Sequence, residues 1–214
     1  MFEEITEKMK SIGIVPVVTI NDAEDTAKIC DALFEGGLRA AEITFRTGDA
    51  EDAIRTASER FPEMLIGAGT VLSCEIAEHA IDAGAKFIVS PGFDQEVVSY
   101  CITHGIAVYP GIGTPTEIIS AIRVGLNSVK LFPAEQSGGT GYLKAISAAF
   151  PGVSFMPTGG INEGNAGDYL MLPQVFCVGG SWMVKKEYIE SKDFARIEML
   201  TKSAAETVKK CRGM

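Results

Sequence analysis

The sequence has few of the residues on which metal and nucleic-acid sites depend. Its two histidines, at positions 79 and 104, lack the spacing of metal ligands. Its 19 lysines and arginines are outnumbered by 28 aspartates and glutamates, so the formal net charge is −9. Nucleic acids and anionic membranes are bound by clustered basic residues, and this composition therefore argues against both as partners. We expect no metal site.

Cysteines are also few and unpatterned. The five cysteines are odd in number and contain no C-x-x-C pair, so neither a disulfide framework nor a zinc ribbon is indicated. The N-terminus begins Met-Phe-Glu-Glu, without the basic and apolar regions of a secretory signal. No apolar run approaches the ~18 residues that span a membrane. We therefore expect a cytoplasmic protein.

Common nucleotide and hydrolase motifs are missing as well. No G-x-x-x-x-G-K-[ST] loop occurs, and the first predicted strand, residues 14–20, is followed by Asn21-Asp22-Ala23-Glu24 and not by G-x-G-x-x-G. Ser181 follows two glycines but has no histidine partner in view, which disfavours a serine hydrolase. Neither of these nucleotide-binding motifs therefore supports nucleotide-dependent chemistry.

What the chain does have is a repeating pattern of apolar runs, each followed by a segment that can be helical. Its 214 residues fit a single domain, 1–214. Apolar residues at helical spacing within residues 2–12 predict a helix before the first strand. Strand-like runs begin near eight residues: Ile14, Ala40, Leu65, Lys86, Ile106, Ser128, Val153 and Val175. Eight such repeats predict an α/β fold, a (β/α)₈ TIM barrel with an extra N-terminal helix; an open doubly wound sheet is the alternative.

Helix boundaries carry recognisable signals. Thr114-Pro115-Thr116-Glu117 combines a threonine cap, a proline in the first turn and a glutamate three residues after the cap, which is a capping box. Gly125 ends that helix. A final helix is predicted from about Asp193 to Lys210, with one apolar stripe.

One apolar run carries a lysine in its middle: Ser128-Val129-Lys130-Leu131-Phe132-Pro133. Neighbouring side chains on a strand point to opposite faces, so Lys130 and Phe132 share the face opposite Val129 and Leu131. Burial disfavours the charged form of an amine, and the uncharged form is the nucleophile. Lys130 is therefore a candidate nucleophile. The alternative is a lysine whose stem covers apolar surface while its amine reaches solvent.

The second predicted strand shows the same alternation. In Ala41-Glu42-Ile43-Thr44-Phe45-Arg46, the polar side chains share one face. In a barrel wrapped by helices this face points inward, so Glu42 and Arg46 enter the same interior as Lys130. An ion pair that only fills the barrel is the alternative. Buried ion pairs are weak sources of stability, however, so three such residues together favour a functional site.

Glycines stand at three predicted strand ends. The third strand ends in Gly67-Ala68-Gly69-Thr70, which could offer backbone amides and a hydroxyl to a carboxylate. Thr158-Gly159-Gly160 and Gly179-Gly180-Ser181 follow the seventh and eighth strands, where (β/α)₈ proteins frequently bind phosphate through backbone amides. Tight turns that need glycine at positive φ are the alternative.

These residues belong to a longer ordered series of motifs, which resembles the 2-keto-3-deoxy-6-phosphogluconate (KDPG) and 4-hydroxy-2-oxoglutarate (KHG) aldolase family. The similarity runs over nearly the whole chain. The motifs that carry it are Ala41-Glu42-Ile43-Thr44 with Arg46-Thr47, Ile66-Gly67-Ala68-Gly69-Thr70-Val71-Leu72, Ser90-Pro91-Gly92, Tyr109-Pro110-Gly111-Ile112, Thr114-Pro115-Thr116-Glu117, Val129-Lys130-Leu131-Phe132-Pro133-Ala134-Glu135, Pro157-Thr158-Gly159-Gly160-Ile161 and Val178-Gly179-Gly180-Ser181-Trp182.

The resemblance implies a class I, Schiff-base aldolase, which is a lyase that splits KDPG into pyruvate and glyceraldehyde 3-phosphate without metal or cofactor. It also implies a homotrimer. The implied site residues form four groups: the Schiff-base lysine with a proton-transferring glutamate, the ligands of the substrate carboxylate, the walls of the substrate pocket, and the phosphate ligands. These groups are, in turn, Lys130 with Glu42; Arg46 with Thr70; Pro91, Phe132 and Thr158; and Gly159, Gly160, Gly180 and Ser181.

Other functions stay open at this point. Within the family, the alternatives are cleavage of KHG to pyruvate and glyoxylate, and cleavage of 2-keto-3-deoxy-6-phosphogalactonate. A phosphosugar isomerase or epimerase on the same barrel would use Glu42 as a base and form no imine. A non-catalytic binder of phosphorylated metabolites would not need Lys130.

Overall fold

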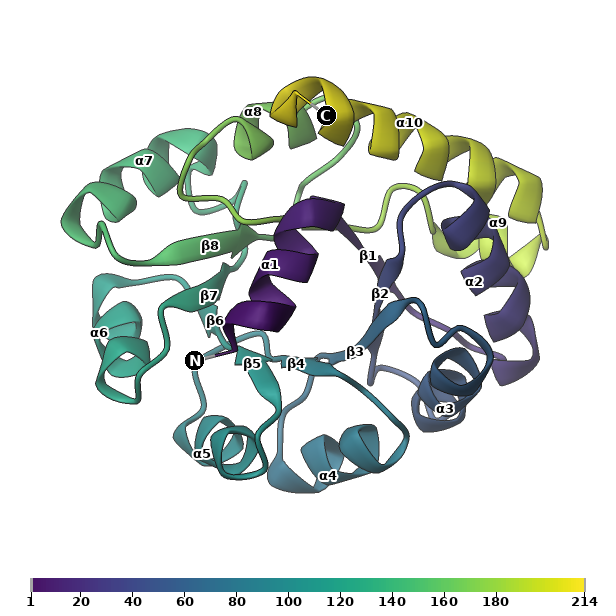
Figure 1. The fold of residues 1–214 in the computed structure, drawn as a ribbon, viewed down its shortest axis with the longest axis horizontal. Helices are drawn as coiled ribbons and strands as arrows, with labels where there is room; N and C mark the ends of the chain where they lie inside the picture. The colour runs from purple at the N-terminus through teal and green to yellow at the C-terminus, as the bar shows by residue number, and fades with distance from the viewer. Residues whose placement is uncertain (1, 214) are drawn as a thin grey trace.

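The computed structural model describes residues 2–213 of the chain. A curled parallel sheet occupies its centre, and helices surround the sheet on the outside (Figure 1). The strands are β1 (Ile14–Val18), β2 (Ala40–Thr44), β3 (Leu65–Gly69), β4 (Phe87–Val89), β5 (Ala107–Tyr109), β6 (Gly111–Ile112), β7 (Ser128–Leu131), β8 (Ser154–Pro157) and β9 (Val178–Gly180). The helices are α1 (Glu3–Ile12), the 3₁₀ helix η1 (Ala23–Asp25), α2 (Thr26–Glu35), α3 (Ala50–Arg60), α4 (Cys74–Asp82), α5 (Gln95–Thr103), α6 (Pro115–Arg123), α7 (Gly139–Ala149), α8 (Ala166–Leu170), α9 (Lys186–Glu190) and α10 (Phe194–Arg212).

The strands follow one another in chain order around the sheet. One run has the order β5-β4-β3-β2-β1-β9 and the other has the order β6-β7-β8, with parallel pairing between the neighbours. Isolated parallel bridges, Phe155 to Val175 and Thr158 to Gly179, connect β8 with the chain at β9. A doubly wound sheet would instead reverse its strand order at its centre. The prediction of an α/β fold with a parallel sheet is confirmed.

Three strand boundaries differ from the sequence prediction. The strand expected from Ile106 is divided into β5 and β6 by Pro110, which has no backbone N–H to donate. The Pro110 carbonyl still accepts a hydrogen bond from the Lys130 amide at 3.0 Å, so the chain remains paired with β7 across this break. The first strand ends at Val18 and not at residue 20. The last begins at Val178, because Val175 pairs only through an isolated bridge.

Two apolar layers follow from the alternation of side chains along the strands. On β2, Ala41 and Ile43 pack outward in the cluster that contains the helices' apolar residues, such as Ile54. Ala40 belongs to an inner cluster with Phe87 and other large side chains. The inner face of the sheet is therefore apolar near the amino-terminal ends of the strands, and the polar residues of the strands lie nearer the carboxyl ends. The outward placement predicted for Ala41 and Ile43 is confirmed.

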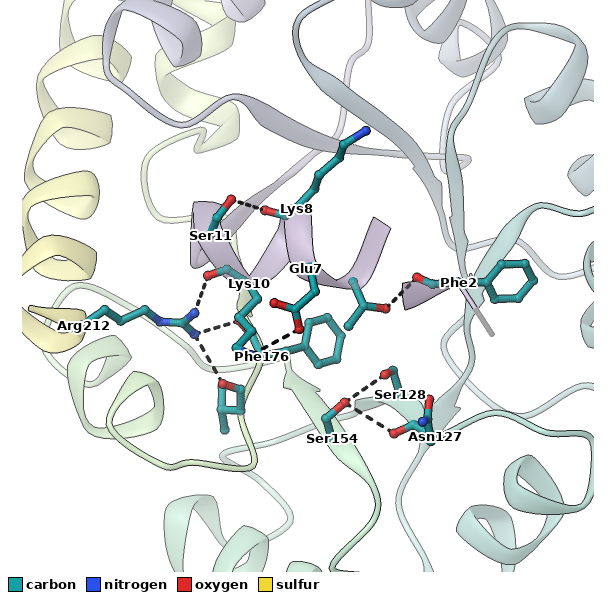
Figure 2. A network of polar contacts seen from close by, with 12 residues as sticks. Phe2, Glu7, Lys8, Lys10, Ser11, Asn127, Ser128, Ser154, Phe176 and Arg212 are labelled. Carbon is teal, nitrogen blue, oxygen red and sulfur yellow. Dashed lines mark hydrogen bonds and ion pairs between the residues drawn. The ribbon is translucent and has the colours of Figure 1, made fainter. Parts of the chain in front are cut away.

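Helix α1 lies across the amino-terminal end of the sheet. Its Met9 is 0% exposed and packs in the inner cluster, while Thr6 shares a hydrogen bond of 3.0 Å with the Tyr109 hydroxyl. Figure 2 shows how Arg212 of α10 reaches the same region and donates to the carbonyl oxygens of Lys10 and Phe176, the latter at 2.7 Å. The first and last helices thus meet where the strands begin.

The helix signals in the sequence correspond to observed caps. The Thr114 hydroxyl accepts from the Glu117 amide, and the Glu117 carboxylate accepts from the Thr114 amide at 2.8 Å, so the capping box is confirmed. Gly125 lies two residues beyond the end of α6 at φ +83°. Among the helices within residues 2–213, none has the length and apolar character needed to cross a membrane.

Candidate active site

A cavity of about 670 Å³ opens at the carboxyl ends of the strands. Its walls come from the segments that follow β1, β2, β7, β8 and β9. The residues that line it are Val17, Thr19, Asn21, Arg46, Phe132, Thr158, Gly159, Gly160, Ile161, Gly179, Gly180, Ser181, Val184, Lys185 and Lys186. This is the end of the sheet at which parallel α/β proteins bind their ligands.

Lys130 and Glu42 form a buried ion pair below this cavity. The Nζ of Lys130 lies 3.4 Å from Oε1 of Glu42, and the two residues are 6% and 1% exposed. The same Nζ lies 5.3 Å from the ring centroid of Phe132, which lines the cavity. Strands β2 and β7 are far apart in the sequence, and the curl of the sheet brings their inward faces together. The amine therefore points inward, as the alternation predicts.

Two buried residues near this pair, Met156 and Cys177, are neutral. Met156 is paired in register with Lys130 and is fully buried. Burial raises the pKa of the Cys177 thiol well above its ordinary value, so this cysteine stays protonated. Glu42 is the carboxylate that lies within ion-pair distance of the Lys130 amine.

One oxygen of the Glu42 carboxylate, Oε2, is free to accept a further hydrogen bond. This atom is buried and has no hydrogen-bond partner among residues 2–213. Leaving a buried polar atom unsatisfied costs about 1–3 kcal/mol, so such an atom needs an explanation. Gly69 makes room for this side chain, since a Cβ at position 69 would lie 2.2 Å from Oε1 of Glu42. The glycine at the end of β3 thus lets the carboxylate approach Lys130.

Arg46 and Thr70 meet at the rim. The Arg46 Nε donates to the Thr70 hydroxyl at 3.1 Å. Thr70 has φ +57°, a left-handed conformation that is strained for a β-branched residue and costs on the order of 1–3 kcal/mol. Because Nε is held by the hydroxyl, the terminal nitrogens of the guanidinium are left to form the fork that fits a carboxylate.

Glycines shape another part of the cavity wall. Gly159 and Gly160 have φ values of +96° and +77°, and a Cβ at position 160 would lie 2.5 Å from Cβ of Glu135. A Cβ on Gly180 would lie 2.0 Å from the Trp182 ring. Both close approaches require glycine, and both glycines line the cavity beside Ser181. Backbone amides of such glycine-rich segments can bind a compact anion.

Comparison with known proteins agrees with this geometry. The family model described as KDPG and KHG aldolase matches residues 5–200. The chain belongs to this family. The resemblance inferred from the motifs is therefore confirmed, and the members that name an activity are aldolases, which are lyases.

Three members of the family illustrate the similarity. The 2-dehydro-3-deoxy-phosphogluconate aldolase of Treponema pallidum is 42% identical over 204 residues, which cover 95% of this chain and 97% of that protein. A KDPG aldolase from Legionella pneumophila, solved with pyruvate captured as a covalent carbinolamine, has a TM-score of 0.89 and 39% identity, covering 92% and 97% of the two chains. The KDPG aldolase of Zymomonas mobilis, solved with 3-phosphoglycerate, has a TM-score of 0.89 and 35% identity, covering 96% of each chain.

In this KDPG/KHG family member, most of the predicted site residues lie together. Seven of them line the cavity: Arg46, Phe132, Thr158, Gly159, Gly160, Gly180 and Ser181. Lys130 and Glu42 lie beneath it, and Thr70 is joined to it through Arg46. Pro91 lies apart from the lining, and its carbonyl packs where a Cβ on Gly111 would be 2.1 Å away. Its predicted role in the substrate pocket stays a prediction.

Several cavity residues were missed by the sequence reasoning. Lys185 and Lys186 line the wall beside Ser181, and their amines lie 3.7 Å and 3.5 Å from the carboxylates of Glu187 and Glu190. Adjacent lysines just after a glycine-rich strand end, in a chain of net charge −9, were the available signal. Thr19 and Asn21 had no such signal. Among residues 2–213, no group of three or more His, Cys, Asp or Glu side chains is arranged to hold a metal ion.

Proposed function

We propose that this chain is a class I aldolase that reversibly cleaves KDPG to pyruvate and glyceraldehyde 3-phosphate. The observation that carries the proposal is the buried amine of Lys130, 3.4 Å from the Glu42 carboxylate and 5.3 Å from the ring centroid of Phe132, which lines the cavity. A buried lysine that can give its proton to a neighbouring carboxylate is a nucleophile suited to attack a ketone. Membership of the aldolase family supports the same chemistry.

In the proposed mechanism, uncharged Lys130 attacks the C2 ketone and water leaves, which gives an iminium ion. A base removes the proton of the C4 hydroxyl, the C3–C4 bond breaks, and its electron pair moves to the iminium nitrogen to give an enamine. Glyceraldehyde 3-phosphate leaves as the aldehyde. The enamine is protonated at C3, and hydrolysis of the new iminium releases pyruvate and restores Lys130.

Glu42 is the group that transfers these protons, directly or through a bound water. Its Oε1 faces Lys130, and its unpartnered Oε2 is available to a hydroxyl or water on the substrate side. Arg46 with Thr70 holds the C1 carboxylate. Phe132, Thr158 and Pro91 form the pocket around the reacting carbons.

Backbone groups hold the phosphate in this proposal. Gly159, Gly160, Gly180 and Ser181 form a wall that a compact anion can approach. Loss of the Ser181 hydroxyl should weaken turnover of phosphorylated substrates, while turnover of KHG, which has no phosphate, should change little. KHG is the second candidate substrate, because the matching family model is described by both activities.

The proposal extends to the architecture and assembly. The chain is a single-domain (β/α)₈ barrel, and α1 is the extra N-terminal helix that covers its amino-terminal end. The strand order and the bridges between β8 and β9 support a closed barrel. The protein acts as a cytoplasmic homotrimer without metal or cofactor, as the family resemblance implies.

Trapping with borohydride tests the mechanism. Reduction in the presence of pyruvate should attach one pyruvate-derived group to the wild-type protein at Lys130, as located by peptide mass spectrometry. Lys130→Met should lose both this adduct and aldol cleavage, whereas Lys144→Met, at an exposed site on α7, should keep both. A Lys130→Met protein that still traps pyruvate at one site would rule out the mechanism. An isomerase or a simple binding protein would give no adduct at all.

A further inference from the structure

Two threonine hydroxyls lie in contact at the cavity end of neighbouring strands. Thr44 is the last residue of β2 and is 0% exposed, whereas Thr19 follows β1 and lines the cavity. Their Oγ1 atoms are 2.9 Å apart. The Thr44 hydroxyl also lies 3.2 Å from the carbonyl oxygen of Val18, to which it donates. Neither threonine has a role in the mechanism above.

Both bonds can form together in only one arrangement of the two hydroxyl protons. A hydroxyl has one proton to donate and two lone pairs that accept. The Val18 carbonyl can only accept, so the proton of Thr44 is used there. The bond between the two threonines is then completed only if Thr19 donates its proton to Thr44. Thr19 therefore presents lone pairs, and no proton, to the cavity.

The position of Thr19 decides which part of a substrate it faces. In the sheet, β1 lies between β2 and β9. Arg46 follows β2, and Gly180 with Ser181 lies at the end of β9. Thr19 thus stands between the side that holds the carboxylate and the side that holds the phosphate in the proposed function. If the substrate is held at these two sides as in the proposed function, its middle carbons, C4 and C5, lie against this stretch of wall.

We propose that Thr19 determines specificity by accepting a hydrogen bond from the C5 hydroxyl of the substrate, and that Thr44 is a positioning residue that fixes the proton of Thr19. This inference rests on the proposed function. In KDPG, C5 carries a hydroxyl that can donate. In KHG, C5 is a carboxylate, whose oxygens repel the lone pairs of Thr19. The site therefore selects hydroxylated aldehydes over glyoxylate.

The test compares two aldehydes in the condensation with pyruvate. One is D-glyceraldehyde 3-phosphate, and the other is 3-phosphooxypropanal, which lacks only the 2-hydroxyl that becomes the C5 hydroxyl. Thr19→Val should reduce kcat/KM about 3- to 10-fold for the hydroxylated aldehyde, the usual net effect of one hydrogen bond, and less than twofold for the deoxy aldehyde. Thr19→Ser keeps the hydroxyl and should retain the wild-type preference.

Thr44→Val tests whether Thr44 orients the proton of Thr19 or only supports the fold. Without Thr44 as an acceptor, Thr19 can turn its proton into the cavity, so the ratio of kcat/KM for KDPG to that for KHG should fall. Thr47→Val is the matched control, because the Thr47 hydroxyl makes a similar bond to the Ile20 carbonyl at 2.5 Å outside the cavity lining. That variant should leave the ratio unchanged.

Borohydride trapping of pyruvate is measured on every variant, because it reports the folded Lys130 site independently of the aldehyde. If wild-type protein traps no pyruvate, the proposed function fails. If trapping is normal but the wild type uses both aldehydes equally, or Thr19→Val affects both equally, the role of Thr19 is overturned. The comparison of the two aldehydes on wild-type protein keeps the proposal falsifiable even if Thr19→Val does not fold, because equal use of both would overturn it.

Discussion

Gly69→Ala is a direct test of the site geometry, because it changes no ionisable group. The added Cβ would lie 2.2 Å from Oε1 of Glu42 and 2.7 Å from its Cγ, so the glutamate must move. Its carboxylate is the far end of a side chain, but Glu42 is 1% exposed and closely surrounded. Any shift that relieves the clash moves Oε1 from its place 3.4 Å from Lys130.

The expected effects differ in size. Overpacking of a closely packed interior costs about 1–3 kcal/mol of folding free energy. For a chain of this length, that lowers Tm by roughly 2–12 °C. Loss of a well-placed general acid and base reduces turnover about 10²- to 10⁴-fold, which is about 3–5 kcal/mol of transition-state stabilisation. Activity should therefore fall far more than stability.

The assay follows pyruvate release from KDPG with lactate dehydrogenase and NADH, below the Tm of the variant. Gly48→Ala is the control, because a Cβ there meets nothing within 4 Å. It should match the wild type in both Tm and kcat. A folded Gly69→Ala protein with wild-type kcat/KM would show that the position of Glu42 is unimportant, and the assigned proton transfer would have to be abandoned.

Three further predictions concern the floor, the rim and the surface. Met9→Ala should lower the free energy of unfolding by about 2–5 kcal/mol in denaturant titrations, because it empties a fully buried site, yet leave kcat unchanged below the Tm. Replacing Lys185 and Lys186 together by alanine should raise KM for KDPG and make that KM less dependent on salt concentration, because both are cationic residues of the cavity wall in an acidic protein. The KM for 2-keto-3-deoxygluconate, which has no phosphate, should not change in this way. The hydrogen bond between His79 and Glu51 raises the pKa of His79 above 6.5 and lowers the pKa of Glu51 below 4.5. The pair therefore stabilises the fold most between pH 4.5 and 6.5. This stabilisation is lost as the pH falls through the pKa of Glu51 or rises through the pKa of His79. His79→Gln should accordingly lower Tm at pH 6 and have little effect at pH 9, and an equal drop at both would contradict this.

Strand alternation is the reason that much of the site could be predicted from the sequence. The side chains of a strand alternate strictly, so the inward direction of Lys130 and Glu42 followed from their apolar neighbours alone. The carboxyl ends of parallel strands lie at one edge of a sheet, so the glycines that end the seventh and eighth predicted strands could be expected at the same edge. Their contact across the sheet required only that the sheet be curled.

Contacts between loops could not be predicted in this way. The bond between Thr19 and Thr44 depends on how far two strand ends extend beyond their backbone pairing. Lys185 and Lys186 reach the cavity because the chain turns after Ser181, and no periodic pattern records that turn. The break at Pro110 was visible as a proline, yet its carbonyl keeps β6 and β7 paired, which only the three-dimensional course of the chain reveals.

Helices α1 and α10 meet at the amino-terminal side of the sheet, so the contacts that stabilise the fold there lie at the end away from the cavity. Thr6, Met9 and Arg212 make contacts that cover that side, while the cavity opens at the other. We therefore expect stabilising substitutions around α1 and substitutions in the cavity wall to have approximately additive effects on folding free energy, since the two regions lie at opposite ends of the strands.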